Sequence, residues 1–342
     1  MAGVRIERFD PAADETRLRE CYELAVSGHE ADDPNVPADS YRRFRSWWTT
    51  GWAGNPQQVW LAATASGTLL GYYHLVLPER ENRANAFLSP FIGPSARRQG
   101  VGSALVAHAA EQAALAGRTL LMSDARVGAP GHAFAESIGA RPGLLEVRRV
   151  LEVGPALHAR LGGLRAEAEQ HSAGYTLRRW VGVTPDELAR PVCALHAAMA
   201  DAPHDDAYEP MAWDPDRLLT DERQIVAEGA RMYSVAAVQD GTGAAAALTQ
   251  VFIDPDVTGW GFQGLTAVTR EHRGHRLGLL VKVDMLDCLA TAEPKLDQIV
   301  TSNAAENEHM IAVNEKLAHK VTDHFHSFEI DVAAAKNLAD HQ

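Results

Sequence analysis

The sequence predicts an α/β protein that contains two tandem copies of one fold. Its 342 residues exceed what one hydrophobic core usually holds, which favours two domains over a single large one. A basic, glycine-containing turn occurs twice, as Arg97-Arg98-Gln99-Gly100-Val101-Gly102 and as Arg273-Gly274-His275-Arg276-Leu277-Gly278. The last glycines lie 278 − 102 = 176 residues apart, about half the chain. In each half, strands precede the turn, and a helix, a short strand, a second helix and a last strand follow it.

The first half contains predicted strands at 69–76 and 86–92, a helix at 100–116, a strand at 119–122, a helix at 131–138 and a strand at 145–150. Apolar residues at every fourth position from Val101 to Ala113 indicate the longer helix, and Gly117 stands where its C-terminal cap belongs. Pro90 lies inside the second strand and marks a bulge or a splayed edge, because proline interrupts ladder pairing.

The second half repeats this order, with predicted strands at 233–238, 244–252 and 260–268, a helix from Leu277 to Leu289, a strand at 298–301, a helix at 307–317 and a strand at 321–330. Helical spacing between the copies predicts a connecting helix rather than a flexible linker. The domain boundaries that follow are 1–154 for the first copy, 155–173 for the connection, 174–330 for the second copy and 331–342 for a tail.

Composition excludes several kinds of protein. The formal charge is −13, with 45 acidic against 32 basic residues and no local basic patch, so we expect no nucleic-acid partner. Three cysteines without C-x-x-C spacing argue against a disulfide framework or a zinc site. His324 and His326 share a strand face but have no third ligand nearby, so no metal is expected. A charged N-terminus and the absence of a long apolar stretch predict a cytoplasmic protein without a membrane segment.

The turn at Arg97 to Gly102 has the chemistry of an anion site. A strand that leads through such a turn into a helix exposes successive backbone N–H groups at the positive end of the helix dipole. Gly100 and Gly102 let phosphate oxygens approach, and Arg97 and Arg98 add charge. The alternative is that the glycines only permit a tight turn. Neither a dinucleotide fingerprint nor a P-loop is present.

Four stretches resemble the GNAT superfamily of N-acetyltransferases, in its tandem two-domain form from actinobacteria, the architecture of mycothiol synthase. They are Leu77 to Arg83, Arg97 to Leu105, Glu271 to Leu279 and Asn303 to Glu315, and the resemblance covers nearly all of the chain. It implies a mixed, mostly antiparallel sheet in each copy, with splayed middle strands and flanking helices. It also implies that acyl-CoA, above all acetyl-CoA, binds in the V-shaped gap and that an amine attacks it directly.

The resemblance assigns the cofactor-binding residues to both copies. The strand residues Phe91, Ile92 and Val268 precede the turns, where a strand N–H would polarise the thioester carbonyl. The other candidates are Arg97, Arg98, Gln99, Gly100, Val101, Gly102, Ser103, Arg273, Gly274, His275, Arg276, Leu277, Gly278, Asn303 and Asn307. Arg276 replaces the first glycine in the second copy, where its side chain would cover or replace part of the phosphate site. We therefore expect cofactor binding in the first copy.

Catalytic groups are less evident, because the acid and the tyrosine that many relatives use are missing. Glu30 and Asp206 are candidate bases in the acidic clusters expected between the first two helices of each copy, although solvated loop charges explain these clusters as well. Tyr233 is a candidate among the tyrosines that remain. Positioning an amine that arrives neutral would also suffice.

Three functions fit the sequence. The first is acyl-CoA-dependent N-acyltransfer to a small-molecule amine in a ternary complex. In the second, one copy is a non-catalytic, structural pseudo-enzyme half. In the third, the protein is a CoA-binding sensor or a repurposed biosynthetic protein that acetylates nothing. The sequence names neither the amine nor the acyl chain, and a homodimer stays open.

Overall fold

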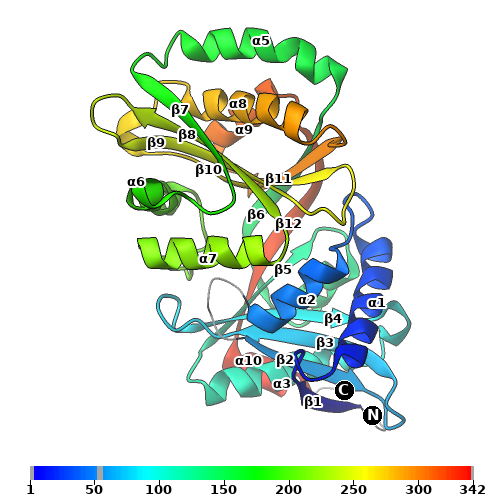
Figure 1. Cartoon of the computed structure of the whole chain (residues 1–342). Helices are drawn as coiled ribbons and strands as arrows, with labels where there is room; N and C mark the ends of the chain where they lie inside the picture. Colours follow the sequence, from blue (N-terminus) through cyan, green and yellow to red (C-terminus); the bar gives the residue numbers. More distant parts are fainter. Residues whose placement is uncertain (1–3, 52–56, 340–342) are drawn as a thin grey trace. The chain divides into compact units, whose positions relative to one another are not determined.

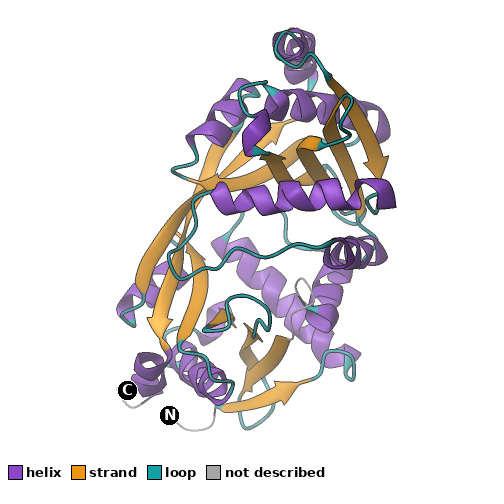
Figure 2. Cartoon of the chain, turned by 90° about the vertical axis from the view of Figure 1, so that its left-hand side faces the viewer, coloured by secondary structure: helices purple, strands orange, loops and turns teal. Residues whose placement is uncertain are grey.

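The structure is a computed structural model that describes residues 4–51 and 57–339, and it consists of two compact units (Figure 1). Neither unit is one continuous stretch of chain. The first unit contains Met1–Glu146, His204–Glu209 and Asp323–Gln342, and the second contains Val147–Pro203 and Pro210–Thr322. Each unit combines a mixed sheet with flanking helices, as the sequence predicts (Figure 2).

The first unit begins with strand β1 and two helices, continues with three consecutive strands, and then alternates helices and strands up to β6. Its elements are β1 (Arg5–Phe9), α1 (Glu15–Asp32), α2 (Tyr41–Thr50), β2 (Gln57–Ala63), β3 (Leu69–Val76), β4 (Asn85–Ile92), η1 (Pro94–Ala96), α3 (Val101–Leu115), β5 (Leu120–Arg126), α4 (Pro130–Ser137), the start of β6 (Arg141–Glu152), most of β12 (Lys320–Asp331), α10 (Val332–Lys336) and η4 (Asn337–Ala339).

The sheet of the first unit runs β1-β2-β3-β4-β5-β12, so a strand from the end of the chain completes it. Strand alternation gives the sheet two apolar faces. Tyr73 and Leu75 of β3 pack with α3 and α10, whereas Tyr72 of β3 packs with α1 and α2. Strand β5 pairs with β4 in parallel on one side and with β12 antiparallel on the other. The first unit thus has a helical layer on each face of its sheet.

The second unit has the corresponding elements. They are the end of β6, α5 (Pro155–Glu169), β7 (Tyr175–Val181), α6 (Asp186–Ala197), η2 (Ala198–Asp201), α7 (Pro215–Ala227), β8 (Arg231–Gln239), β9 (Ala245–Ile253), β10 (Trp260–Val268), η3 (Arg270–His272), α8 (Leu277–Ala292), β11 (Gln298–Ala304), α9 (Glu308–Lys316) and the start of β12. The sheet order is β7-β8-β9-β10-β11-β6. Helices α5 and α8 contribute to the core on one face, and α6 and α7 to the core on the other.

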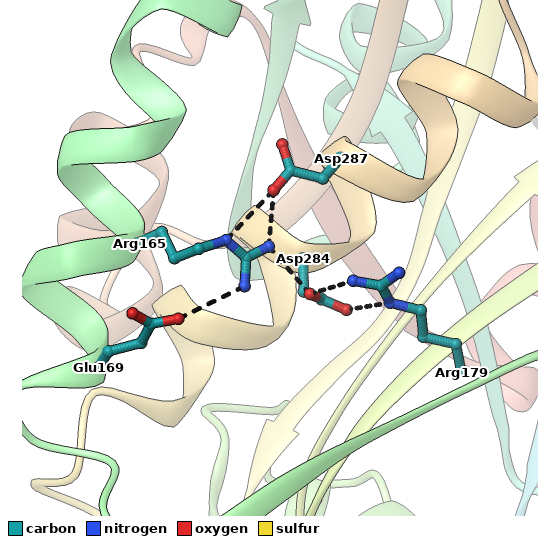
Figure 3. A network of polar contacts seen from close by, with 5 residues as sticks. All are labelled: Arg165, Glu169, Arg179, Asp284 and Asp287. Carbon is teal, nitrogen blue, oxygen red and sulfur yellow. Dashed lines mark hydrogen bonds and ion pairs between the residues drawn. The ribbon is translucent and has the colours of Figure 1, made fainter.

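Ion pairs hold helix α8 in the second unit. Figure 3 shows Arg179 of β7 and Arg165 of α5 converging on Asp284, which is 1% exposed in its side chain. Arg179 donates to both carboxylate oxygens at 2.6 Å, and Arg165 donates to one of them at 2.9 Å. Breaking such a buried pair leaves an uncompensated charge, so α8 is firmly fixed on the sheet.

The predicted elements agree with the structure except where pairing extends a strand. Strands β3 and β10 have the predicted bounds. Strand β5, expected at 119–122, continues to Arg126, because residues Leu120 to Arg126 all pair with β12. The polar sequence Ser123-Asp124-Ala125-Arg126 does not indicate a strand by itself. Its extension depends on a partner strand almost 200 residues away in the sequence.

Candidate functional site

The turn between β4 and α3 has two residues in the left-handed region. Arg98 has φ 60° and Gly100 has φ 80°. From Gly100 to Ser103 the backbone N–H groups find no acceptor among the described residues. Left-handed residues beside a helix N-terminus turn successive N–H groups to one side, which forms a concave anion site. The turn thus has the geometry that its sequence predicts.

The two arginines of this turn have different partners. Arg97 donates to both carboxylate oxygens of Asp32, at 2.9 and 2.6 Å, and its Nε donates to the Ile92 carbonyl at 3.2 Å. Its charge is therefore paired with the end of α1 and fixes the turn there. Arg98 forms no ion pair with any residue that the structure describes, and it borders the adjacent cavity. Arg98 is the cation that can meet an anion.

A cavity of about 500 Å³ opens where β4 and β5 separate. The two strands pair in parallel only from Asn85–Leu120 to Phe87–Met122. Beyond this point their facing edges have no ladder partner among the described residues. Residues of the turn, of α3, of α4 and of strands β4, β5 and β12 line the cavity. They include Leu88, Pro90, Phe91, Ile92, Arg97, Arg98, Gly100, Gly102, Ser103, Val106, Leu121, Ser123, Asp124, Ala125, Phe134, Ala135 and Phe328. Pro90 stands in this wall, at the splayed edge that its sequence position predicts.

Gly102 keeps the cavity wall compact next to the turn. A Cβ atom at this position would lie 3.2 Å from Cζ of Phe134 and 3.6 Å from Cδ1 of Ile92. Such a contact is tighter than ordinary van der Waals packing, so a larger residue would push the Phe134 ring. Gln99 and Val101 belong to the predicted set but are not among the wall residues of this cavity. Val101 is instead buried in the core beneath α3.

Asp124 of β5 is the ionisable group of the cavity wall that the sequence reading missed. Asp124 is exposed where it lines the cavity, and the many protein atoms nearby still desolvate its carboxyl enough to raise its pKa. Its carboxylate accepts no hydrogen bond from a described residue. The signal available in the sequence was an acidic residue shortly after the apolar residues Leu120 to Met122, but the strand was expected to end two residues before Asp124.

Further carboxylates lie close to Asp124. Desolvation and then the charges of Asp124 and Asp205 raise the pKa of Glu146 on β6. Asp205 accepts hydrogen bonds from the Leu144 N–H at 2.6 Å and from the Ser327 hydroxyl at 2.8 Å. Ser327 stands directly opposite Asp124 in the β5–β12 ladder, so these two side chains share a sheet face. Asp124, Glu146 and Asp205 therefore form a cluster of carboxylates in the first unit.

The three predicted catalytic residues lie in different places. Glu30 is exposed in helix α1, which corrects the expectation of a loop there, because α1 continues to Asp32. Asp206 is exposed and belongs to the 204–209 segment of the first unit. Tyr233 lies on β8 of the second unit and donates its hydroxyl to Glu293 at 2.6 Å. Desolvation, with this bond and the Glu293 charge, raises the Tyr233 pKa to about 12.

The turn of the second unit copies the first one in its backbone. Gly274 has φ 87° and Arg276 has φ 54°, at the positions of Arg98 and Gly100. Arg273 repeats the contacts of Arg97, since it pairs with Asp201 at 2.7 Å and donates from Nε to the Val268 carbonyl at 3.4 Å. The guanidinium of Arg276 lies 3.6 Å from Glu167. Arg276 therefore takes a conformation that favours glycine and points its charge to α5.

The remaining predicted residues of the second unit have structural partners. His275 Nδ1 lies 3.2 Å from the His171 carbonyl. Leu277 is buried at the start of α8, and the next residue of the helix is Gly278. The Asn307 side chain caps α9 by accepting from the Met310 N–H at 3.2 Å, and the Asn303 side chain accepts from Asn314 at 2.7 Å.

The described part of the chain offers neither a cluster of metal ligands nor a helix that could span a membrane. His326 Nδ1 lies 3.2 Å from His132 Nε2, which pairs the two rings. Residues 4–51 and 57–339 contain no group of three His, Cys, Asp or Glu residues that could hold a metal ion. Within the same ranges, the helices are too short or too polar to cross a membrane.

Comparison with known proteins gives a family match within the first half of the chain. A sequence model of the acetyltransferase (GNAT) family matches residues 18–139. Among solved structures, a tandem GNAT protein from the clavulanic acid biosynthesis pathway shares 26% identity, with 96% of this chain and 98% of that chain covered and a TM-score of 0.78. A GCN5-related N-acetyltransferase from Sphaerobacter thermophilus shares 16% identity over 96% of each chain, with a TM-score of 0.66, and shows the fold. No curated protein sequence matches.

These comparisons confirm the resemblance that the sequence motifs indicate. The chain carries a GNAT acetyltransferase domain and has the tandem GNAT architecture over nearly its whole length. The matched residues include the turn, the parted strands β4 and β5 and Asp124, so most of the cavity wall lies within the matched acetyltransferase region.

Proposed function

We propose that this tandem GNAT protein is an N-acyltransferase that transfers the acyl group of acyl-CoA, above all acetyl-CoA, to a small-molecule amine in a ternary complex. The observation that carries the proposal is the cavity of about 500 Å³ that joins the turn to the parted strands β4 and β5. It provides, in one continuous wall, groups for each part of the donor.

The donor fits the residues of the first unit part by part. The free N–H groups from Gly100 to Ser103 and the unpaired Arg98 suit a pyrophosphate, because both the backbone dipoles and the guanidinium favour negative charge. The open edges of β4 and β5 offer backbone groups to the amides of a pantetheine arm. Apolar wall residues such as Leu88, Val106 and Phe134 suit its methylene groups.

The cluster of carboxylates in the first unit suits an amine acceptor. A primary amine is mostly an ammonium ion at neutral pH, and the carboxylates of Asp124, Glu146 and Asp205 attract it. Acyl-CoA supplies a thioester whose carbonyl carbon an amine can attack. Asp124 accepts one proton from the ammonium before the attack, since its raised pKa brings the carboxylate closer to the basicity that a general base needs. The neutral amine then forms the C–N bond as the C–S bond breaks. The second proton of the amine goes to the leaving thiolate, which departs as free CoA thiol.

Residues 204–209 border the acceptor side and are firmly anchored to the first unit. The Asn85 side chain donates to the Ala207 carbonyl at 2.7 Å, and Asn82 exchanges backbone and side-chain hydrogen bonds with Glu209 at 2.6 to 2.7 Å. A Cβ atom at Gly143 would lie 2.2 Å from Oδ1 of Asp205, so only glycine fits beneath the segment. In sequence this segment belongs to the second copy, so the second copy contributes to the acceptor side.

The exchange Arg98→Glu tests the donor site. We expect it to weaken acetyl-CoA binding by roughly 100-fold, because it replaces an unpaired cation beside the pyrophosphate with an anion. Isothermal titration calorimetry with acetyl-CoA measures the loss. Arg178→Glu, on exposed β7 of the second unit, makes the same charge change elsewhere and should leave the affinity unaltered. Equal affinities of both variants would refute the assignment of the turn to the pyrophosphate.

A panel of small amines, followed by release of free CoA thiol, tests the transfer itself. Turnover with at least one amine supports the proposal. Tight binding of acetyl-CoA without turnover of any diamine, amino sugar or amino acid would identify the protein as a CoA-binding protein instead.

A further inference from the structure

Three positions that line the cavity of the first unit have counterparts of a different chemistry in the second. Gly100 and Arg276 are the left-handed N-caps of α3 and α8, so Val106 corresponds to Lys282 six residues later. The Ala140 N–H donates to the Ala135 carbonyl at 3.1 Å, and the His319 N–H donates to the Asn314 carbonyl at 3.0 Å. Ala135 therefore corresponds to Asn314, because the two helix ends are built alike.

The third position follows from the turns after β5 and β11. The Ala129 N–H donates to the Arg126 carbonyl, and the Asn307 N–H donates to the Ala304 carbonyl, each at 3.0 Å. Strand β5 starts its parallel pairing with β4 at Leu120, and β11 starts its parallel pairing with β10 at Gln298. The difference in residue number between Leu120 and Gln298 equals that between Ala129 and Asn307. Ala125 of the cavity wall thus corresponds to Asn303.

The three polar residues of the second unit are joined in one chain of hydrogen bonds. Lys282 Nζ donates to Asn314 Oδ1 at 2.9 Å, and Asn314 Nδ2 donates to Asn303 Oδ1 at 2.7 Å. Lys282 is 3% exposed and Asn314 is 0% exposed, whereas Ala135 is partly exposed where it lines the cavity. The hydrogen-bonded side chains of Lys282, Asn314 and Asn303 thus take the place of the smaller apolar Val106, Ala135 and Ala125, and they close the corresponding space in the second unit.

The closure cannot be relieved by a shift of one side chain. Asn314 is held from both sides, by Lys282 and by Asn303, and removal of any member leaves a buried polar group without its partner. Helix α8, which carries Lys282, is fixed two residues later by the ion pairs of Asp284 (Figure 3). A pantetheine arm would have to displace this network and separate the buried amine of Lys282 from its acceptor Asn314.

We infer that Lys282, Asn314 and Asn303 fill the donor cleft of the second unit, so the chain binds one acyl-CoA, in the first unit, and the second unit is not an acyltransferase. The inference rests on the proposed function for the first unit. It assigns the second copy a supporting role, in which it supplies residues 204–209 to the acceptor side.

The stoichiometry of acetyl-CoA binding to the full chain tests this inference. We expect one site per chain by calorimetry and by native mass spectrometry. Ala135→Trp fills the cavity of the first unit and should abolish that site, since Ala135 lines it. Two sites in the unaltered chain, or one site that survives Ala135→Trp, overturn the inference. No binding at all would instead contradict the proposed function, so the two failures are distinguishable.

A gain of binding provides the stricter test. The triple variant Lys282→Val, Asn303→Ala, Asn314→Ala places the three residues of the first cavity in the second unit. We expect the stoichiometry to rise from one to two. A folded triple variant, by circular dichroism, that still binds one acetyl-CoA overturns the assignment of these side chains as the barrier. If this variant does not fold, Ala135→Trp decides the question alone.

Discussion

Asp124→Asn is expected to lower the turnover number of acyl transfer by about 10²- to 10⁴-fold, the usual contribution of a positioned general base. The asparagine preserves size and shape but cannot accept the proton of the attacking amine. Binding of acetyl-CoA should be unchanged, because the turn and Arg98 hold the donor. Steady-state assays of thiol release, with the affinity measured by calorimetry, separate the two effects.

The pH profile identifies the role of Asp124 more specifically. A base works only when deprotonated, so turnover of the unaltered enzyme should fall as the pH drops through the raised pKa of this carboxyl. The acidic limb of the profile should vanish in Asp124→Asn. Asp206→Asn removes an exposed carboxylate from the neighbouring 204–209 segment, and its turnover should stay within about threefold of the unaltered value. A larger loss in Asp206→Asn than in Asp124→Asn would assign the base to Asp206.

Local sequence signals were sufficient to predict the turn between β4 and α3. Glycine and arginine at 97–102, in front of an apolar helical stripe, determine a left-handed turn and a helix N-terminus without reference to the rest of the fold. The partner of Arg97 could not be inferred in this way. Asp32 lies 65 residues earlier, and only packing of α1 against the sheet brings the two together. The sequence therefore could not show that the charge of Arg97 is paired with Asp32.

Long-range pairing explains what the sequence missed. Strand β12 completes the sheet of the first unit, and no residue of β5 predicts that β5 pairs with β12. This pairing extends β5 to Arg126 and thereby places Asp124 in the cavity wall. The hydrogen bonds of Lys282 also depend on residues far away in the sequence. From the sequence alone, a single lysine on an apolar helix is expected to extend its charged end to solvent. Only the fold shows that Asn314 and Asn303 enclose it.

Lys282 should also make the stability of the protein depend on pH. Burial lowers the pKa of its amine from 10.5 to about 7, and the neighbouring His319, whose pKa falls to about 3, stays neutral at these pH values. Between pH 7 and 10.5 the unfolded chain binds a proton at Lys282 that the folded chain does not. The free energy of unfolding therefore rises with pH in this window through Lys282, by up to about 1.4 kcal/mol per pH unit, and this contribution is lost as the pH falls toward 7.

The exchange Lys282→Met isolates this contribution, because methionine has a similar shape and no charge. The free energy of unfolding of the variant, relative to the unaltered chain, should fall by about 1 kcal/mol per pH unit between pH 7.5 and 9. Urea denaturation at several pH values measures it. Lys295→Met, at an exposed position before β11, should differ from the unaltered chain by a constant amount. A constant difference for Lys282→Met as well would mean that Lys282 keeps its charge in the folded chain, in contact with water that the closed cleft excludes.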